Sequence, residues 1–152
     1  MINVEVFSDE KNWSKKLKKK QIFFNDICNA FPQKYKFSKK KVSFSLMLSN
    51  NKKIRKLNKK FRKKDKTTDV LSFPFYEKDI LKKLLKKKIN FYLGDVVINL
   101  NKINGYKNED FKKNFDKLWI HGFLHLLGYR HKLDKEFIKM SNLEKKFFKS
   151  IN

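Results

Sequence analysis

In residues 42–48, VSFSLML, the most apolar side chains occupy every second position. Because successive side chains of a strand point to opposite faces, this alternation predicts a strand with one strongly apolar face. Three other segments are also expected to form strands: residues 2–7, 70–75 and 91–98. The chain is therefore expected to build its core on a sheet.

Apolar residues recur at helical spacing elsewhere in the chain. They are Trp13, Leu17, Phe24, Ile27 and Phe31; Ile54, Leu57 and Phe61; Phe111, Phe115, Leu118 and Leu126; and Phe137, Met140, Leu143 and Phe147, the last four in a helix expected to start near Leu133. Strands and helices alternate without a Gly/Ser-rich linker or a repeat, so we expect one mixed α/β layer structure, a single domain over residues 1–152.

The composition excludes some classes of protein and leaves others open. The 152 residues carry 39 Lys and Arg against 15 Asp and Glu, a formal charge of +24. A hydrophobic fraction of 40% with 16 Phe is too high for a disordered tail. Lys makes up 36 of the 39 basic residues, as codon bias in an AT-rich genome would also produce. The charge alone therefore does not assign a nucleic-acid partner.

Two Lys-rich segments stand out. Residues 52–66 contain ten Lys or Arg, and we expect Ile54, Leu57 and Phe61 to face the core while the charges face solvent. This surface either attracts a nucleic-acid backbone or simply reflects the Lys-rich composition. Residues 77–90 are expected to form an amphipathic helix on the core, in preference to a membrane-surface or nucleic-acid arm.

The remaining signals concern the cellular compartment. Cys28 is the single cysteine and stands among apolar residues, which favours a buried thiol in a reducing environment. The N-terminus has no basic segment followed by an apolar run, and no apolar stretch approaches the roughly 18 residues of a membrane span. We expect a cytoplasmic protein without a membrane partner.

All three histidines lie within eleven residues, in HGFLHLLGYRH at 121–131. On a helix, His121 and His125 are one turn apart and project from the same face. Gly128 stands where a left-handed glycine commonly ends a helix, so the chain can turn back and bring in His131. Three imidazoles suit Zn²⁺, with a fourth position open for water as in catalytic sites. We expect His121, His125 and His131 to be metal ligands.

The same spacing matches the metzincin protease motif H-E-x-x-H-x-x-G-x-x-H. Metzincins use the Glu that follows the first His as general base, and Gly122 stands there in this chain. A metalloprotease is therefore disfavoured.

The histidine stretch, followed by Met140 and Glu144, resembles the signature of the bacterial endoribonuclease YbeY family. Residues 57–75, LNKKFRKKDKTTDVLSFPF, and 93–99, LGDVVIN, agree in order and spacing. The resemblance implies an α/β (α+β) fold with a single small mixed sheet of about four strands and helices packed on it. It also implies a single-strand-specific, zinc-dependent endoribonuclease acting in 16S rRNA 3′-end maturation and ribosome quality control.

The resemblance also assigns residues and partners. His121, His125 and His131 would bind one zinc ion, and Arg62 would face it across a basic cleft. A fixed guanidinium stabilises the charge that develops on a phosphodiester better than a mobile ammonium does. From the basic run at 52–66, and not from the resemblance, we also expect Lys63 and Lys64 to bind substrate. The expected partners are single-stranded RNA, notably rRNA, the small ribosomal subunit and its assembly factors.

Several alternatives stay open at this point. The family has Asp where this chain has Arg130, which reverses the charge beside His131; this arginine either weakens metal binding or points to solvent and contacts phosphate. Asp95 could accept a hydrogen bond from a histidine and so fix its tautomer. Asp69 could do the same, or it could cap a turn. Three aromatic residues either stack on RNA bases or belong to the core: Phe61, Phe73 and Tyr129. A non-catalytic, zinc-stabilised RNA-binding ribosome-assembly factor is the alternative function.

Overall fold

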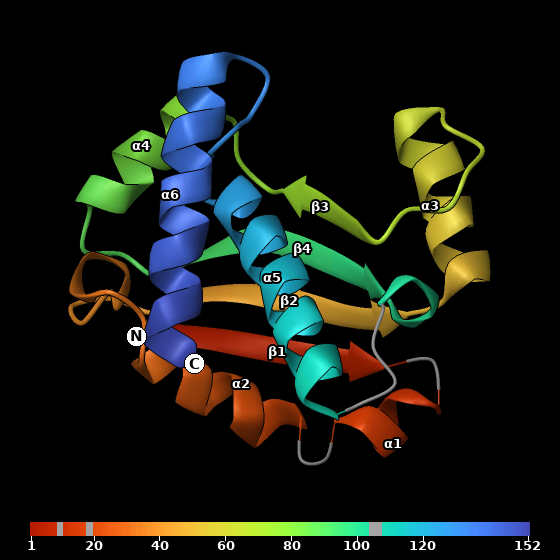
Figure 1. Ribbon diagram of the computed structural model, residues 1–152. Coiled ribbons are helices and arrows are strands. Elements are labelled where there is room, and N and C mark those ends of the chain that lie inside the picture. Colours follow the sequence, from red (N-terminus) through yellow and green to blue (C-terminus); the bar gives the residue numbers. More distant parts are fainter. Residues whose placement is uncertain (9–10, 18–19, 104–107) are drawn as a thin grey trace.

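A mixed four-stranded sheet forms the centre of the computed structural model, which describes residues 1–8, 11–17, 20–103 and 108–152 (Figure 1). The strand order is β1-β2-β4-β3. The strands are β1 (Ile2–Ser8), β2 (Val42–Ser49), β3 (Val70–Pro74) and β4 (Phe91–Asn99). β1, β2 and β4 run parallel, whereas β3 is antiparallel to β4. The predicted α+β fold with a small mixed sheet is confirmed.

The helices cover the two faces of this sheet unequally. They are α1 (Trp13–Lys16), α2 (Lys20–Asn29), α3 (Asn51–Arg62), α4 (Lys78–Lys86), α5 (Asn108–Leu126) and α6 (Asp134–Ile151), with 3₁₀ turns at Gln33–Tyr35 and Leu100–Lys102. The helical spacing predicted from Trp13 to Phe31 is only partly confirmed: Trp13 lies in α1, and Phe24 and Ile27 lie in α2. Leu17, which is extended, and Phe31 lie just after these helices.

One sheet face carries the main core. The alternating side chains of β2, namely Val42, Phe44, Leu46 and Leu48, are fully buried there. Aromatic rings from α5 pack above them, with Phe123 5.1 Å from Phe44 between ring centroids. Burial of this apolar surface is the main source of stability. The prediction that residues 42–48 form a strand with one apolar face is therefore confirmed. Helix α5 packs on that face.

The opposite face, under α3, has a much smaller core. Ile54, Leu71 and Val97 are its buried residues. Phe61 does not join them: it is 56% exposed, and its ring meets the Phe73 ring in an edge arrangement with the centroids 5.3 Å apart. The prediction that Phe61 faces the core is therefore wrong, because α3 extends past the few apolar side chains of this face.

A buried amide joins the segments at the end of β4. Asn99 is fully buried, and its Nδ2 donates to Asn51 Oδ1 at 2.8 Å and to the Thr68 carbonyl at 3.0 Å. Its Oδ1 accepts from the Asn101 backbone N–H at 3.1 Å. The start of α3 and the segment leading into β3 are thus bonded to one side chain.

The Lys-rich segment 77–90 contains the helix α4, as predicted. Leu81 is buried in the main core, with Leu84 and Leu85 packed at its edge, whereas Ile80 is half exposed. Cys28 is buried, as expected, and burial raises the pKa of its thiol to about 12. In the described part of the chain, no helix is long and apolar enough to cross a membrane.

Candidate functional site

Helix α5 carries two of the histidines and lies unusually close to the sheet. A Cβ placed on Gly122 would come within 2.6 Å of Val96 Cγ1 on β4. The Ser72 hydroxyl on β3 donates to the Gly122 carbonyl at 3.2 Å, which ties the helix to the strand. Glycine is required here because no side chain fits between helix and sheet.

The position of Gly122 also bears on the protease alternative. Its neighbour His121 is half-buried beside a cavity, whereas Gly122 is buried against the sheet. A glutamate at this position would enter the core and could not reach the histidines. The structure therefore gives a second reason against a metzincin mechanism.

The end of α5 brings the third histidine back. Gly128 has φ +85°, the left-handed conformation predicted for it. The Gly128 N–H bonds to the His125 carbonyl at 3.0 Å, and the Tyr129 N–H bonds to the Leu124 carbonyl at 3.1 Å. This pair of bonds is the Schellman motif, which reverses the chain after a helix. His131 consequently returns to the face that carries the other two rings.

The three histidines form one cluster. Ring centroids are 4.6 Å apart for His121 and His125, 5.0 Å for His125 and His131, and 5.4 Å for His121 and His131. One ligand atom from each ring lies within 4.8 Å of the others. The Nε2 atoms of His121 and His125 are 3.0 Å apart. The predicted grouping of the three residues is present in the structure.

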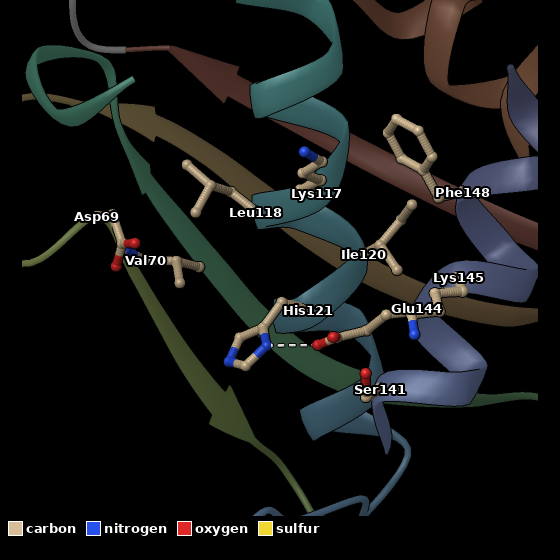
Figure 2. Close-up of a pocket in the computed structure, with 10 residues that line it drawn as sticks. All are labelled: Asp69, Val70, Lys117, Leu118, Ile120, His121, Ser141, Glu144, Lys145 and Phe148. Carbon is tan, nitrogen blue, oxygen red and sulfur yellow. Dashed lines mark hydrogen bonds and ion pairs between the residues drawn. The ribbon is translucent and has the colours of Figure 1, made fainter. Parts of the chain in front are cut away.

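Hydrogen bonds at the outer ring nitrogens fix the tautomers. His125 Nδ1 lies 2.9 Å from the Tyr129 carbonyl, which can only accept, so this nitrogen carries the proton. His121 Nδ1 lies 2.6 Å from Glu144 Oε1 on α6, and the carboxylate is likewise an acceptor (Figure 2). Both Nε2 lone pairs therefore point into the cluster, as in metal sites whose ligands are held by outer partners.

The donor set fits a divalent transition metal. Two converging nitrogen lone pairs only 3.0 Å apart repel unless a cation or proton lies between them. The pKa of His125 is lowered to about 4, chiefly by burial and in smaller part by the charges of His121, His131 and Arg130, while the bond to Tyr129 opposes the shift. His125 is therefore neutral near pH 7, the form that binds a metal.

Glu144 is the partner that sequence reasoning did not identify. It stands in the part of the chain that carries the family resemblance, yet nothing in its spacing indicated His121 as its partner. A carboxylate between the apolar positions Leu143 and Phe147 of an amphipathic helix was the available signal. The pairing itself depends on how α6 packs on α5.

A polar cavity of about 420 Å³, here called the arginine cavity, opens beside the histidines. Arg62 lines it from the end of α3, and its Nη2 donates to the Ser72 carbonyl at 2.9 Å. Arg130 and Lys132 line it as well. Arg62 thus faces the histidine cluster across this cavity.

The two substrate-binding lysines predicted from sequence lie farther along. Lys63 ends α3 in a left-handed conformation, and its Nζ donates to the Lys60 carbonyl at 3.3 Å. Among the residues that the structure describes, neither Lys63 nor Lys64 lines the arginine cavity. Lys132, which sequence reasoning did not select, takes the position beside the histidines.

Arg130 adds positive charge at the site. Its Nη1 donates to the carbonyls of His125 and Tyr129, both at 3.1 Å. The Tyr129 oxygen is also the acceptor for His125 Nδ1. Arg130 therefore shares the hydrogen-bond acceptor that fixes a histidine tautomer, and it lines the cavity while doing so.

The two aspartates considered as histidine partners, Asp69 and Asp95, lie in different surroundings. Asp69 Oδ1 accepts from the Val70 N–H at 2.8 Å and from the Thr68 hydroxyl at 3.1 Å, which is the turn-capping role, although Asp69 also lines the arginine cavity. Asp95 accepts from the Tyr92 hydroxyl at 2.6 Å on the α3 side of the sheet. A role for Asp95 behind the histidines is wrong, because its neighbour Val96 is the residue that faces α5.

The candidate stacking residues lie apart from the cluster. Phe61 and Phe73 line an apolar groove on the α3 side of the sheet. The Tyr129 hydroxyl bonds to the Tyr35 hydroxyl at 2.9 Å. Neither arrangement places a ring over the arginine cavity.

The chain is similar to several known proteins. The family model described as "Endoribonuclease YbeY" matches residues 6–152. The protein named "Endoribonuclease YbeY" from Pelagibacter ubique (strain HTCC1062) is 50% identical over 154 aligned residues, covering 99% of this chain and 97% of that protein. The one from Mycoplasmopsis pulmonis (strain UAB CTIP) is 36% identical, covering 85% of each.

A solved structure also matches over the whole fold. The solution structure of TM1509 from Thermotoga maritima has a TM-score of 0.57 and 27% identity, covering 99% of this chain and 89% of that chain. The histidine cluster, the close approach of α5 to the sheet and the matches over the full length lead to one conclusion. The chain belongs to the endoribonuclease YbeY family.

Proposed function

We propose that this protein is a zinc-dependent endoribonuclease that cuts single-stranded RNA. Its substrate in the cell is ribosomal RNA, at the 3′ end of 16S rRNA, during maturation and quality control of the small ribosomal subunit in the cytoplasm. The family membership supports the reaction class, because the matched relatives are named endoribonucleases. The zinc, the substrate position and the ribosomal partners are the finer parts of the proposal.

One observation carries the proposal: three histidine nitrogens converge beside a cavity whose far side holds Arg62. His121, His125 and His131 would hold the zinc ion. When bound there, zinc supplies a Lewis acid for a phosphoryl oxygen and activates water. Three imidazole ligands leave room in its coordination shell for water and substrate.

The chain's own groups then position the phosphate. Arg62 is tied to the Ser72 carbonyl through Nη2, and its other N–H groups remain to bind a phosphate oxygen. A guanidinium held in this way stabilises negative charge developing on phosphorus with little reorganisation. Glu144 and the Tyr129 carbonyl keep the Nδ1 protons in place, so the inner nitrogens stay lone-pair donors.

The surrounding charge attracts the strand. Arg130 and Lys132 add two positive groups to the cavity, and the ten basic residues of segment 52–66 lie on α3 and the loop after it. Such a surface binds nucleic-acid backbone without regard to sequence and weakens steeply with salt. Lys63 and Lys64 belong to this surface and would contact the substrate away from the scissile phosphate.

Arg130 favours a second candidate function. A cation that lines the cavity repels a metal ion, and it shares the acceptor of His125. If this reduces metal binding sufficiently, the protein is a non-catalytic RNA-binding assembly factor. The carboxylate at Glu144 and the full set of histidines favour the enzyme.

The test is cleavage of a fluorescent single-stranded RNA by purified protein, with zinc and with a chelator. We expect about one zinc ion per chain, cleavage that the chelator abolishes and zinc restores, and no cleavage by His121→Ala. Asn142→Ala, an exposed change on α6, is the control. Cleavage that survives both the chelator and His121→Ala would exclude the metal mechanism.

Two further measurements complete the test. Zinc-loaded protein that binds RNA without cutting it would favour the assembly factor. Analysis of the product ends distinguishes attack by the substrate 2′-hydroxyl, which leaves a cyclic phosphate, from attack by water. Accumulation of 16S precursors with extended 3′ ends in cells lacking the protein would support the ribosomal substrate, whereas unchanged ends would contradict it.

A further inference from the structure

A second cavity, of about 430 Å³, adjoins the arginine cavity at His121 (Figure 2). The two cavities share Asp69, Val70 and His121 in their linings. The part that belongs to the second cavity alone lies between α5 and α6. There α5 contributes Lys117, Leu118 and Ile120, and α6 contributes Ser141, Lys145 and Phe148. A strand held at the histidines can therefore extend from one cavity into the other.

The chemistry of the second cavity differs from that of the first. The arginine cavity presents the cations Arg62, Arg130 and Lys132. The second cavity instead has apolar walls from Val70, Leu118, Ile120 and Phe148. Lys117 and Lys145 line it beside Phe148, and its carboxylates, Asp69 and Glu144, are bonded to the Val70 N–H and to His121. Its volume lies within the range of about 300–1,000 Å³ that is usual for ligand sites.

Apolar walls with adjacent cations match one part of the substrate. A nucleobase has apolar faces that stack on aromatic rings, and it is joined through its sugar to anionic phosphates. Phe148 offers such a ring, with Lys117 Nζ 5.8 Å from its centroid. A lysine in this place can contact both the ring of a base and the phosphate beside it.

We propose that this cavity, here called the base cavity, takes one unpaired nucleobase of the RNA, next to the phosphate held at the histidines. Lys117 and Lys145 neutralise the adjoining phosphate. The inference rests on the proposed function and explains a preference for single strands. A base in a duplex must leave its stack and its partner before entering the cavity, whereas an unpaired base is already free.

The RNA side of the test uses strands that lack one base at a time. Zinc-loaded protein first locates the cut in a short single-stranded RNA. Affinity is then measured by fluorescence anisotropy with zinc-loaded wild-type protein and strands that carry a non-cleavable phosphate analogue at the cut. We expect an abasic residue to weaken binding about fivefold or more at one position beside the cut, and little elsewhere. If all strands that lack one base bind with equal affinity, the cavity does not bind a base. A protein segment would then be the better candidate for this cavity.

The protein side compares matched lysines. Lys117→Gln and Lys145→Gln remove charge at the base cavity, whereas Lys113→Gln and Lys146→Gln remove exposed charge from the same two helices, at positions outside the described linings. We expect the first pair to weaken binding severalfold more than the second. In Phe148→Leu, the penalty for the critical abasic position should shrink while the melting temperature stays near that of the wild type.

The two proposals fail differently. Wild-type protein that neither binds nor cuts single-stranded RNA contradicts the proposed function itself. Wild-type protein that cuts RNA, with the two lysine pairs equivalent and Phe148→Leu equally sensitive to the missing base, contradicts the base cavity alone. Weakening by the lysine variants without any abasic effect assigns the cavity to the backbone and also overturns the base.

Discussion

The two faces of the sheet carry hydrophobic cores of very different size. On one face, α5 carries fully buried rings such as Phe123 and Trp119 into the main core. On the other, α3 rests on a cluster of three buried residues and leaves Phe61 more than half exposed. The histidines stand on the deep side, and Arg62 reaches the same cavity from the helix of the shallow side. The three histidines therefore have rigid support, while the phosphate contact proposed for Arg62 depends on one anchored side chain.

The largest expected difference between the faces is in stability. Phe123→Ala should lower the free energy of unfolding by about 3–5 kcal/mol, because a fully buried ring leaves a cavity. Phe61→Ala, the same substitution on α3, should cost less than about 1 kcal/mol. Chemical denaturation of both variants measures the difference. Equal losses would contradict the contrast between the two faces.

The second prediction concerns the residue that joins the two faces. Arg62→Lys should reduce cleavage about a hundredfold or more, since one ammonium cannot both hold the Ser72 carbonyl and present paired donors to phosphate. Zinc content and melting temperature should not change. Arg55→Lys is the control, because Arg55 pairs with Asp65 on the exposed side of α3. Undiminished cleavage by Arg62→Lys would remove Arg62 from the mechanism.

The third prediction tests the support on the deep side. Glu144→Gln should weaken zinc binding by about 10- to 100-fold, because the neutral amide no longer stabilises the proton on His121 Nδ1. Glu136→Gln is the matched change elsewhere on α6. Zinc affinity can be measured by competition with a fluorescent chelator. If the two variants bind zinc alike, the Glu144 contact does not hold the ligand.

The smallest expected effect belongs to the loop after α5. Arg130→Asp should raise zinc affinity severalfold, because it replaces a repelling charge at the cavity with an attracting one in a partly exposed place. Lys132→Asp makes the opposite-charge substitution at a neighbouring lining position and serves as the comparison. Zinc affinity that falls in Arg130→Asp would show that the hydrogen bonds of Arg130 matter more than its charge.

The sequence predicts features that depend on a single helix or strand, but not contacts between elements that are distant in the chain. The alternation in β2 and the spacing of His121 and His125 depend on one element each, and both are confirmed. Gly128 ends its helix as its position indicated. The pairing of Glu144 with His121 joins residues 23 positions apart, so it depends on helix packing that no short pattern records.

The wrong predictions have equally local causes. Phe61 has the spacing of a core residue, but the face on which α3 lies supplies too few apolar side chains to cover it. Asp95 was a candidate partner for a histidine because a carboxylate in an apolar strand is costly to bury alone. Successive side chains of a strand point to opposite faces of the sheet, so Asp95 lies on the α3 face while Val96 meets α5.

The buried amide of Asn99 joins the two segments that position Arg62. By bonding to Asn51 at the start of α3 and to Thr68 ahead of β3, it fastens together the two segments that carry Arg62 and its anchor Ser72. The start of α3 and the segment leading into β3 are therefore fixed to the same point at the end of β4. Arg62 stands at the other end of α3, so the placement of its helix depends in part on a buried side chain far from the phosphate it would bind.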